Sequence, residues 1–204
     1  MKTLQTTQFA VQSNGRLTRE SLDYLRAIGL TFEENGRSLI TSCQNQPVDI
    51  LYLRSSDIPE YVSRGVASFG IVGENVLYEK RARVKIVRRL GFAMCSLVIA
   101  VPKGSPIKTL QDLEGERIAT SYPRILREFL NKKKINAAII SIQGSVEITP
   151  SVNLADAVCD LVQSGRTLRE NNLTPIQKVL DSEAVLIASP EMDTTRASSI
   201  INYV

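Results

Sequence analysis

Short apolar runs alternate with helical patterns along most of the chain, and this alternation constrains the fold more than any other feature. The runs are rich in β-branched residues, as in 48–53 (VDILYL) and 95–101 (CSLVIAV). Helical spacing of apolar residues follows Thr18, which is expected to cap a helix that Gly29 ends. Strands that alternate with helices predict an α/β fold with parallel or mixed sheets. We expect strands at 8–12, 38–42, 48–53, 69–72, 84–90, 95–101, 117–120, 137–142 and 158–162, and further helices at 56–64, 74–80, 123–133 and 166–171.

A boundary between two lobes is expected near Gly91, where two strand patterns follow each other almost without a break. The second half of the chain then has its own series of strands and helices. We therefore expect two small α/β lobes with a central cleft. Lobe I comprises residues 1–91 and about 176–204, and lobe II comprises residues 92–175. Ligands of such folds bind at the carboxyl ends of the strands.

The composition excludes several classes of chemistry. The chain has 204 residues, of which 43% are hydrophobic and 23% charged, as is ordinary for a globular protein. It has no histidine, which excludes Ser-His-Asp and Cys-His catalysis, His-ligated zinc and imidazole acid–base chemistry. Any reaction must use carboxylates, arginine, lysine or backbone dipoles.

The cysteines and the N-terminal region indicate a reducing compartment. Cys43, Cys95 and Cys159 are odd in number, far apart and placed in or beside apolar stretches, as buried thiols are. The first residues lack a long apolar segment followed by a cleavage site, and no stretch approaches a membrane span. The cytoplasm is the expected location.

Basic residues concentrate only mildly, at 80–89 (KRARVKIVRR), and the net charge is +4. Val84 and Ile86 alternate with Arg83 and Lys85, which is typical of a half-buried strand with a solvated basic face. A polyanion-binding surface is the alternative. No aromatic residues interleave with these charges to stack on bases, and we expect no binding of nucleic acid.

The most informative stretch for chemistry is 147–168 (EITPSVNLADAVCDLVQSGRTL). The turn Ser164-Gly165-Arg166-Thr167 follows a strand and opens a helix, and first-turn amides, hydroxyls and an arginine suit a monophosphate. Asp156 and Asp160, a few residues upstream, could hold sugar hydroxyls or Mg²⁺ carried by a phosphorylated sugar. The alternative is a helix capped by Ser164 with exposed acids.

The string E-x5-N-x-A-x2-V-x-D-L-x2-S-G-x-T-L, from Glu147 to Leu168, resembles the signature of the ATP phosphoribosyltransferase family. The resemblance covers nearly the whole chain in the order of the family. Its other motifs are Asn14-Gly15-Arg16-Leu17, Arg37-Ser38-Leu39, Leu53-Arg54-Ser55-Ser56-Asp57-Ile58-Pro59, Gly70-Ile71-Val72-Gly73-Glu74-Asn75, Ile118-Ala119-Thr120-Ser121-Tyr122-Pro123 and Ser182-Glu183-Ala184-Val185-Leu186-Ile187.

The resemblance implies a fold and a reaction. The fold is two-lobed, like that of type II periplasmic binding proteins. The reaction opens histidine biosynthesis: N1 of the adenine of ATP displaces pyrophosphate from C1 of phosphoribosyl pyrophosphate, with Mg²⁺ as the implied cofactor. The transition state is oxocarbenium-like, so the protein must stabilise positive charge on the ribose and negative charge on the departing pyrophosphate.

The resemblance also implies roles for particular residues, with the metal ligands left unassigned. The implied catalytic residues are Arg16, Arg37, Asp156 and Asp160. The implied ligands of phosphoribosyl pyrophosphate are Asp156, Asp160, Ser164, Gly165, Arg166, Thr167 and Leu168. The implied ATP-binding residues are Gly15, Arg16, Leu17, Arg54, Asp57 and Tyr122. For Arg54 and Asp57, the alternative is a local salt bridge at the start of a helix.

Four departures from the family pattern and the partners complete the expectations. Ser68 stands where the family commonly has aspartate, and Ser96 stands where an arginine often follows the cysteine. Asn14 stands where many members have lysine, and Asn153 replaces a signature glycine. Asparagine tolerates positive φ, so the backbone at residue 153 is expected to survive. The resemblance implies a homo-oligomer and allows a separate regulatory subunit resembling histidyl-tRNA synthetase. The rival function is a non-catalytic ligand-binding or regulatory paralogue with the same two lobes.

Overall fold

The computed structural model of the chain describes residues 6–34 and 38–191. The chain divides into two compact units: unit 1 is Met1–Ala93 with Glu183–Val204, and unit 2 is Met94–Ser182. Each unit has its own sheet and helices, which confirms the α/β class. Residues 176–182, which we assigned to lobe I, fall in unit 2 because strand β10 (Leu173–Ser182) pairs with β6 (Cys95–Pro102) throughout.

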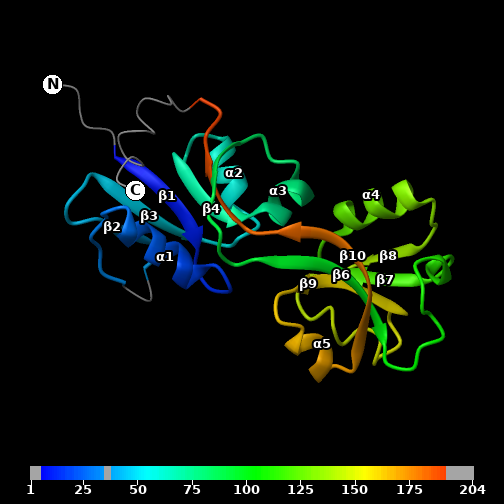
Figure 1. Cartoon of the computed structure of the whole chain (residues 1–204). Coiled ribbons are helices and arrows are strands. Elements are labelled where there is room, and N and C mark those ends of the chain that lie inside the picture. The colour runs from blue at the N-terminus through cyan, green and yellow to red at the C-terminus, as the bar shows by residue number, and fades with distance from the viewer. Residues whose placement is uncertain (1–5, 35–37, 192–204) are drawn as a thin grey trace. The chain divides into compact units, whose positions relative to one another are not determined.

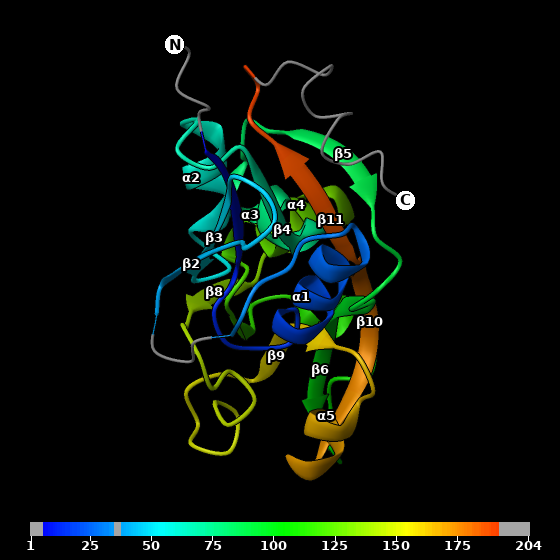
Figure 2. The same cartoon turned by 90° about the vertical axis from the view of Figure 1, so that its left-hand side faces the viewer.

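Unit 1 is built on a mixed sheet. Its strands are β1 (Thr7–Gln12), β2 (Ile40–Ser42), β3 (Val48–Leu53), β4 (Phe69–Gly73), β5 (Lys85–Arg89) and β11 (Ala184–Ala188), and its helices are α1 (Thr18–Ala27), α2 (Ile58–Ser63) and α3 (Glu74–Lys80). The strand order is β2-β3-β1-β4-β11-β5. Strands β3, β1 and β4 are parallel, whereas β11 runs antiparallel between β4 and β5 (Figure 2).

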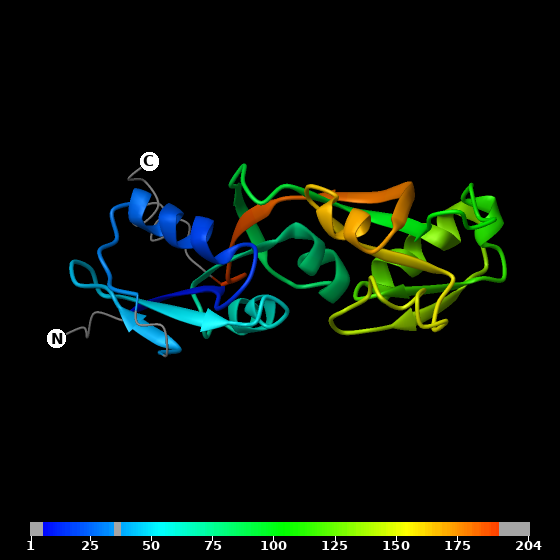
Figure 3. The same ribbon diagram turned by 90° about the horizontal axis from the view of Figure 1, so that it is seen from below.

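Helices cover both faces of the unit 1 sheet. Helix α1 packs on one face, where Phe9 and Phe69 stack with their ring centroids 4.8 Å apart. Helices α2 and α3 pack on the other face (Figure 3). Ile58 and Val62 belong to the same core cluster as Val72 there. Since both faces are covered, the central strands read as continuous apolar runs rather than alternating ones, and all of β4 is buried.

The ends of helix α1 match the sequence expectation only in part. Gly29 does end the helix: it has φ +91° and its N–H donates to the Arg26 carbonyl at 2.9 Å. Thr18 does not cap it, because it is already the first helical residue and Leu17 occupies the N-cap without a side-chain bond. The Thr18 hydroxyl instead turns inward, where it finds no partner among the described residues.

Strand β5 carries the basic stretch, and every one of its residues is exposed. The expectation of a solvated basic face is confirmed, but the expected half-burial of the strand is wrong, because Ile86 is 49% exposed and Val87 is 42% exposed. The strand forms one edge of the sheet and pairs only with β11 in the described part of the chain. Its charged residues also discourage unwanted pairing with another strand.

Unit 2 is built on a second mixed sheet. Besides β6 and β10 it contains β7 (Arg117–Thr120), β8 (Ala138–Ser141), β9 (Ala157–Val162), a short 3-10 helix at Gln111–Leu113, α4 (Pro123–Lys133) and α5 (Arg166–Glu170). The strand order is β10-β6-β9-β7-β8, with β9, β7 and β8 parallel. Helices α4 and α5 lie on opposite faces of this sheet (Figure 1).

The connection from β8 to β9 crosses the sheet as a series of turns instead of a helix. Val146 and Ala155 anchor it in the core beside Val158. Asn153, near its end, has φ +62°, so the expectation that asparagine keeps the backbone of a glycine position is confirmed. We call residues 142–156 the crossover.

Three further features complete the comparison with the sequence. Strand β10 was not expected as a strand. Cys43, Cys95 and Cys159 form no disulfide; Cys95 and Cys159 are buried and Cys43 is half-buried. In residues 6–34 and 38–191, no helix is long and apolar enough to cross a membrane.

Candidate functional site

The carboxyl ends of β1, β3 and β4 lie at one edge of the unit 1 sheet, because these strands are parallel. The loop 13–17 follows β1, Arg54 follows β3, and helix α3 follows β4. The topology therefore brings Arg16 and Arg54 to the same sheet edge, where ligands of open α/β sheets bind.

The loop after β1 is shaped so that one side chain projects from it. Gly15 has φ +131°, and a Cβ there would collide with the Gln12 side chain. Leu17 is buried, and its N–H donates to Gln12 Oε1 at 3.3 Å. Arg16 is half-buried, with Nη1 donating to the Ala93 carbonyl at 2.5 Å. Gly15 and Leu17 thus act through the backbone, and Arg16 supplies the charge.

Arg54 and Asp57 are both exposed and do not pair with each other. Asp57 accepts a hydrogen bond from the Ser56 hydroxyl at 3.0 Å, and its N–H donates to the Arg54 carbonyl at 2.9 Å. In the described part of the chain Arg54 makes no ion pair, so the alternative of a local salt bridge at this helix start is wrong. Arg37 lies outside the described residues.

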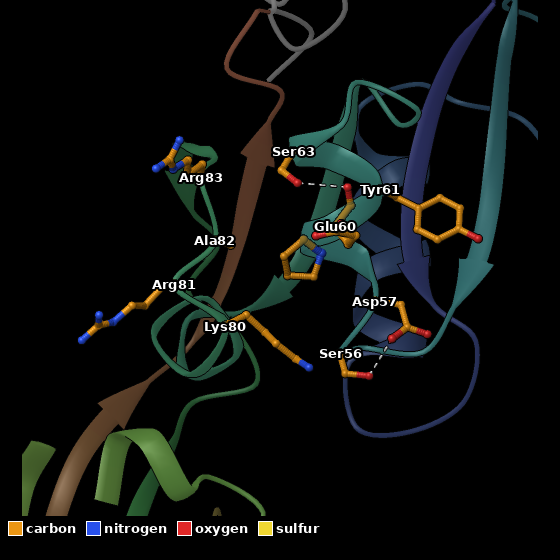
Figure 4. Close-up of a pocket in the computed structure, with 10 residues that line it drawn as sticks. Ser56, Asp57, Glu60, Tyr61, Ser63, Lys80, Arg81, Ala82 and Arg83 are labelled. Atoms are coloured by element: carbon orange, nitrogen blue, oxygen red, sulfur yellow. Dashed lines mark hydrogen bonds between the residues drawn. The ribbon is translucent and has the colours of Figure 1, made fainter. Parts of the chain in front are cut away.

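Asp57 also lines a groove of about 660 Å³ between α2 and the segment that follows α3. Figure 4 shows the Lys80 side chain extending toward Ser56 and Asp57 from the opposite wall. Glu60 lines the same groove and is neutralised by Arg64, at 2.5 Å. Three cations (Lys80, Arg81 and Arg83) and two acids (Asp57 and Glu60) therefore line the groove, and positive charge is in excess.

In unit 2, the carboxyl ends of β7, β8 and β9 also share one edge. Ser121 and Tyr122 follow β7, and the loop 163–168 follows β9. The Tyr122 N–H donates to Thr120 Oγ1 at 2.9 Å, and the Ser121 hydroxyl donates to the Ile142 carbonyl at 2.8 Å. Tyr122 thus belongs to unit 2, whereas Arg16, Arg54 and Asp57 belong to unit 1.

The loop after β9 has the conformation of an anion-binding turn. Gly165 adopts φ +71° at the N-cap of α5, and the Arg166 N–H points to Ser164 Oγ at 3.4 Å. Leu168 is buried and holds the helix on the sheet, whereas Ser164 and Thr167 are exposed. The first-turn amides of α5 have no intrahelical acceptors and carry the positive end of the helix dipole.

The arginines beside this loop divide between two tasks. Arg166 pairs with Glu170 at 2.6 Å, so its guanidinium is partly engaged. Arg169 donates to the Ser164 carbonyl at 3.2 Å and underlies Gly165, whose Cβ would lie 3.3 Å from Arg169 Nη1. Arg169 was not predicted as a site residue. Its signal is a basic side chain four residues after Gly165, close enough along the chain to reach back to the carbonyl of Ser164.

Asp160 lies near the carboxyl end of β9, just before the loop. It is half-buried, and desolvation raises the pKa of its carboxyl to about 6, with the negative charge of Glu147 adding to the rise. The Leu161 N–H donates to Asp160 Oδ1 at 2.8 Å and opposes this shift. No cation pairs with Asp160 within residues 6–34 and 38–191. Its negative charge is therefore uncompensated.

Asp156 lies at the amino end of β9, directly before its first residue, whereas Asp160 lies near the carboxyl end of the strand. Arg117 grips its carboxylate through Nε at 2.9 Å and Nη2 at 2.8 Å, and the Arg117 N–H adds a bond at 2.9 Å. The hydrogen bonds from Arg117 lower the pKa of Asp156 to about 2. Because a strand rises about 3.3 Å per residue, Asp156 lies about 13 Å from Asp160 along the chain direction.

The structure therefore does not bring the expected acid pair together. Residues alternate between the two faces of a strand, so Asp160 shares a face with Val158, beside the crossover that carries Glu147. The negative charge of Glu147 contributes to the raised pKa of Asp160, whereas that of Asp156 does not. The acid pair near the loop is Asp160 with Glu147.

This acid pair limits what metal the unit could hold. No group of three or more acidic or thiol side chains in the described ranges could hold a metal ion. Mg²⁺ is usually held by one or two carboxylates together with substrate phosphates and water, rather than by a cage of protein ligands. Asp160 and Glu147 fit that requirement.

The two units carry different chemistry at these sheet edges. Unit 1 has guanidinium groups, which suit a multi-oxygen anion. Unit 2 has the loop 164–168, whose first-turn amides suit an anion, and a carboxylate without a cation among the described residues. A sugar phosphate that develops positive charge at carbon, or carries a metal, suits the unit 2 edge.

Comparisons with known proteins agree with this chemistry. The family model described as ATP phosphoribosyltransferase matches residues 54–204. The ATP phosphoribosyltransferase of Cytophaga hutchinsonii is 46% identical over 93% of this chain and 66% of the relative. That of Parabacteroides distasonis is 47% identical over 89% of this chain and 64% of the relative. The chain thus spans just under two thirds of the length of these curated relatives.

Solved structures extend the likeness to the fold. A chain of the ATP phosphoribosyl transferase (HisG:HisZ) complex from Thermotoga maritima has a TM-score of 0.81 and 27% identity, over 97% of this chain and 94% of that chain. The substrate-binding protein of an amino acid ABC transporter has a TM-score of 0.65 at 12% identity, over 97% of this chain and 90% of that chain. The second likeness shows the fold alone and confirms the expected relation to binding proteins.

Proposed function

The chain belongs to the ATP phosphoribosyltransferase family, and from this premise we propose that it transfers the 5-phosphoribosyl group of phosphoribosyl pyrophosphate to N1 of ATP. The products are phosphoribosyl-ATP and pyrophosphate, and the reaction opens histidine biosynthesis. The observation that carries the proposal is the uncompensated Asp160 beside the anion-binding loop 164–168.

The loop 164–168 supports the binding of the ribose 5′-phosphate. First-turn amides of α5 and the hydroxyls of Ser164 and Thr167 can surround a phosphate. Among the described residues, the one acidic side chain that bonds the loop is Glu170, on Arg166. Arg169 holds the loop from behind through the Ser164 carbonyl. Preorganisation of this kind means that the phosphate need not order the loop on binding.

Asp160 supports the chemical step. The bond from C1 to N1 of adenine forms as the bond from C1 to pyrophosphate breaks, and the bonding electrons leave with pyrophosphate. The ribose is then oxocarbenium-like, and a fixed carboxylate in a half-buried site stabilises that positive charge more strongly than water would. We assign this role to Asp160. Asp156 is bound by Arg117, and we assign it to fastening the crossover instead.

The anionic groups of the substrates require positive charge. Arg16 and Arg54 at the unit 1 edge are suited to the phosphates of ATP and the departing pyrophosphate, and Arg37 is proposed for the same task from the resemblance. Gly15 and Leu17 shape the loop that presents Arg16. Asp57 and Tyr122 remain proposed ATP ligands.

Mg²⁺ is the proposed cofactor, and it supplies positive charge to the pyrophosphate leaving group when bound. The residues that would hold it are Asp160 and Glu147, together with substrate oxygens. A homo-oligomer and a separate regulatory subunit are proposed partners, and the similarity to a chain of the HisG:HisZ complex from Thermotoga maritima supports the second. Buried cysteines that form no disulfide support a cytoplasmic location.

A coupled assay tests the proposal. The purified full chain is mixed with ATP, phosphoribosyl pyrophosphate and Mg²⁺, and both pyrophosphate release and phosphoribosyl-ATP absorbance are followed. We expect product only when both substrates are present. The same assay is run with the regulatory subunit added, because the proposed partner is expected to affect turnover.

Binding measurements separate the two candidate functions. Calorimetric titration with each substrate is expected to show binding that Thr167→Ala weakens for phosphoribosyl pyrophosphate and leaves unchanged for ATP. Binding of both substrates without product, with and without the partner, would support the non-catalytic paralogue. A folded chain that binds neither substrate would overturn the assignment of the site.

A further inference from the structure

Arg89, the last residue of β5, joins two acids that the proposed reaction does not use. Its Nη1 and Nη2 donate to the two carboxylate oxygens of Glu74 at 2.7 and 2.6 Å, and Nη1 also donates to Glu183 Oε1 at 3.2 Å. The Glu74 side chain is only 5% exposed, and it accepts a further bond from the Tyr78 hydroxyl at 3.0 Å. We call Glu74, Arg89 and Glu183 the clamp.

The clamp holds the chain where it leaves unit 1 and where it returns. The Glu183 carbonyl accepts the N–H of Glu74 at 3.0 Å, and Glu183 Oε2 accepts the N–H of Gly91 at 3.0 Å. The Ala184 N–H then donates to the Phe92 carbonyl at 3.1 Å. The outgoing segment 90–93 is therefore fixed against the start of β11 by both side chains and backbone.

Arg16 is positioned by backbone that adjoins the clamp on two sides. Its Nη1 donates to the Ala93 carbonyl, two residues beyond Gly91, and Ala93 holds the unusual φ of +51°. On the other side lies Gly73, which immediately precedes Glu74. A Cβ on Gly73 would lie 3.9 Å from Arg16 Nη2. Ala93 and Gly73, which lie near the Arg16 guanidinium, are thus one or two residues in sequence from Glu74 and Gly91, which the clamp holds.

A purely stabilising role does not explain this arrangement well. Burial of a carboxylate costs desolvation that its ion pair roughly repays, so well-packed apolar residues often give equal or greater stability. The best-attested benefit of such a pair is that it selects one arrangement of the chain over others. Here the selected arrangement is that of the segments beside Arg16.

We infer that the clamp is a positioning device that sets the guanidinium of Arg16 for the anionic substrate. Arg89, Glu74 and Glu183 are then positioning residues and touch no substrate. The inference rests on the proposed function in one respect, since Arg16 is assigned there to substrate phosphates. The clamp gives acids that belong to unit 1 a role in the reaction.

The test compares the clamp with a neighbouring arginine in two backgrounds. The full chain is made as wild type, as Arg89→Lys, and as the pair Arg89→Met with Glu74→Gln, which avoids a buried unpaired carboxylate. Arg88→Met on the same exposed strand is the matched control. Each is made again with Arg16→Ala, and the Kd for ATP is measured by calorimetry.

Coupling between the clamp and Arg16 decides the result. We expect the paired clamp variant to weaken ATP binding about tenfold when Arg16 is present and less than twofold with Arg16→Ala, because residues acting through one group are not additive. Arg88→Met should change neither value. Arg89→Lys keeps the charge but loses the two-pronged geometry, and it should be intermediate. Equal losses in both backgrounds would overturn the inference.

A second readout does not depend on the enzyme. The guanidinium resonances of Arg16 are recorded by ¹⁵N NMR in the chain without substrate, and assigned by their loss in Arg16→Ala. We expect the clamp variants to change the chemical shifts of these resonances and to speed rotation about the Cζ–Nη1 bond. Arg88→Met should leave the chemical shifts unchanged. Unchanged resonances in the clamp variants would overturn the inference. A wild-type chain that neither binds ATP nor forms product overturns the proposed function, and the NMR result still decides the clamp.

Discussion

The two ends of strand β9 carry the same kind of side chain in opposite electrostatic settings. At the amino end, Arg117 donates several hydrogen bonds to Asp156 and lowers its pKa to about 2. At the carboxyl end, desolvation raises the pKa of Asp160 to about 6, and the nearby Glu147 adds to the shift. Both acids are fixed by the fold, yet only Asp156 has a cation to balance it in the described part of the chain.

This contrast separates an acid that holds the fold from an acid available to a ligand. A carboxylate that is paired with a cation stabilises the surrounding fold, and it interacts only weakly with a further positive charge on a substrate. An uncompensated, half-buried carboxylate is costly to the free protein, and a cationic ligand or transition state relieves that cost. The guanidinium groups of unit 1 show the same division, because Arg89 is fully paired with acids whereas Arg54 is exposed without an ion pair among the described residues.

Asp160→Asn should have the largest effect and would break the comparison most directly. Loss of the fixed negative charge beside the ribose is expected to lower kcat/KM about 100-fold. Steady-state kinetics with both substrates measures this, and circular dichroism confirms the fold. The matched control is Asp156→Asn, at the other end of the same strand, which should lose less than about threefold. Equal losses at both ends would contradict the division of roles.

The pH dependence of the stability of Asp160→Asn gives a second test of the contrast between Asp160 and Asp156. The folded-state pKa of Asp160 lies above the unfolded value of about 3.9, so its contribution to stability is fully present below pH 4 and is lost as pH rises through about 6. At pH 7 the charge is a net cost. Asp160→Asn should therefore raise the free energy of unfolding by up to about 2 kcal/mol at pH 7, and change it little at pH 4. Urea unfolding at the two pH values tests the sign.

Gly165→Ala should disturb the phosphate loop itself. The residue has φ +71°, where a Cβ costs about 1–2 kcal/mol, and it would press on Arg169. We expect that loss of stability and a roughly tenfold higher KM for phosphoribosyl pyrophosphate, since about 1.4 kcal/mol corresponds to a factor of ten. Gly104→Ala, at φ +90° with open space around it, is the control. It should lose comparable stability and leave KM unchanged.

Asp156→Asn should act mainly on the stability of unit 2. Since the folded-state pKa is depressed, the contribution of this carboxylate is present above the unfolded pKa of about 3.9 and is lost as pH falls through about 2. After screening by solvent, the variant should be less stable by about 1 kcal/mol at pH 7. The deficit should vanish near pH 2. Thermal unfolding across this range measures it, and a deficit that persists in acid would contradict the assigned cause.

Asn153→Gly should have the smallest effect. Glycine relieves the cost of φ +62°, but it also gives the unfolded chain more freedom, and the two contributions oppose each other. The free energy of unfolding should change by less than about 0.5 kcal/mol, with kcat/KM unaltered. Urea unfolding and steady-state kinetics measure the two quantities. A large gain in activity would show that the asparagine alters the crossover, which carries Glu147 toward Asp160.

Periodicity predicted the buried runs and also the exposed edge strand β5, but it missed the edge strand β10. The runs that became β3, β6 and β9 are apolar because the sheets are covered, so their composition reports their environment directly. Strand β10 escaped prediction because it lies at the edge of its sheet, contains Pro175 and changes register twice against β6. Polar residues and a proline are what an edge strand tolerates, and they hide its period.

The candidate site was predictable where it is local in sequence. Ser164, Gly165 and Thr167 form one turn, and the chemistry of that turn follows from their order. The partner of Asp156 was not predictable, because Arg117 is 39 residues away and meets it only through pairing of β7 with β9. Spacing made Asp156 and Asp160 look like a pair, but four residues along an extended strand span far more than four residues around a helix.

The placement of β11 has a consequence for how the protein is made. This strand lies inside the unit 1 sheet, between β4 and β5, yet its residues follow the whole of unit 2 in the chain. A ribosome therefore finishes the continuous unit 2 before it delivers the strand that completes unit 1. Before β11 is made, β4 and β5 lack the strand that pairs with both of them, and their backbone groups on that side are unpaired. The unit 1 sheet can therefore be completed only after the last strand has been synthesised.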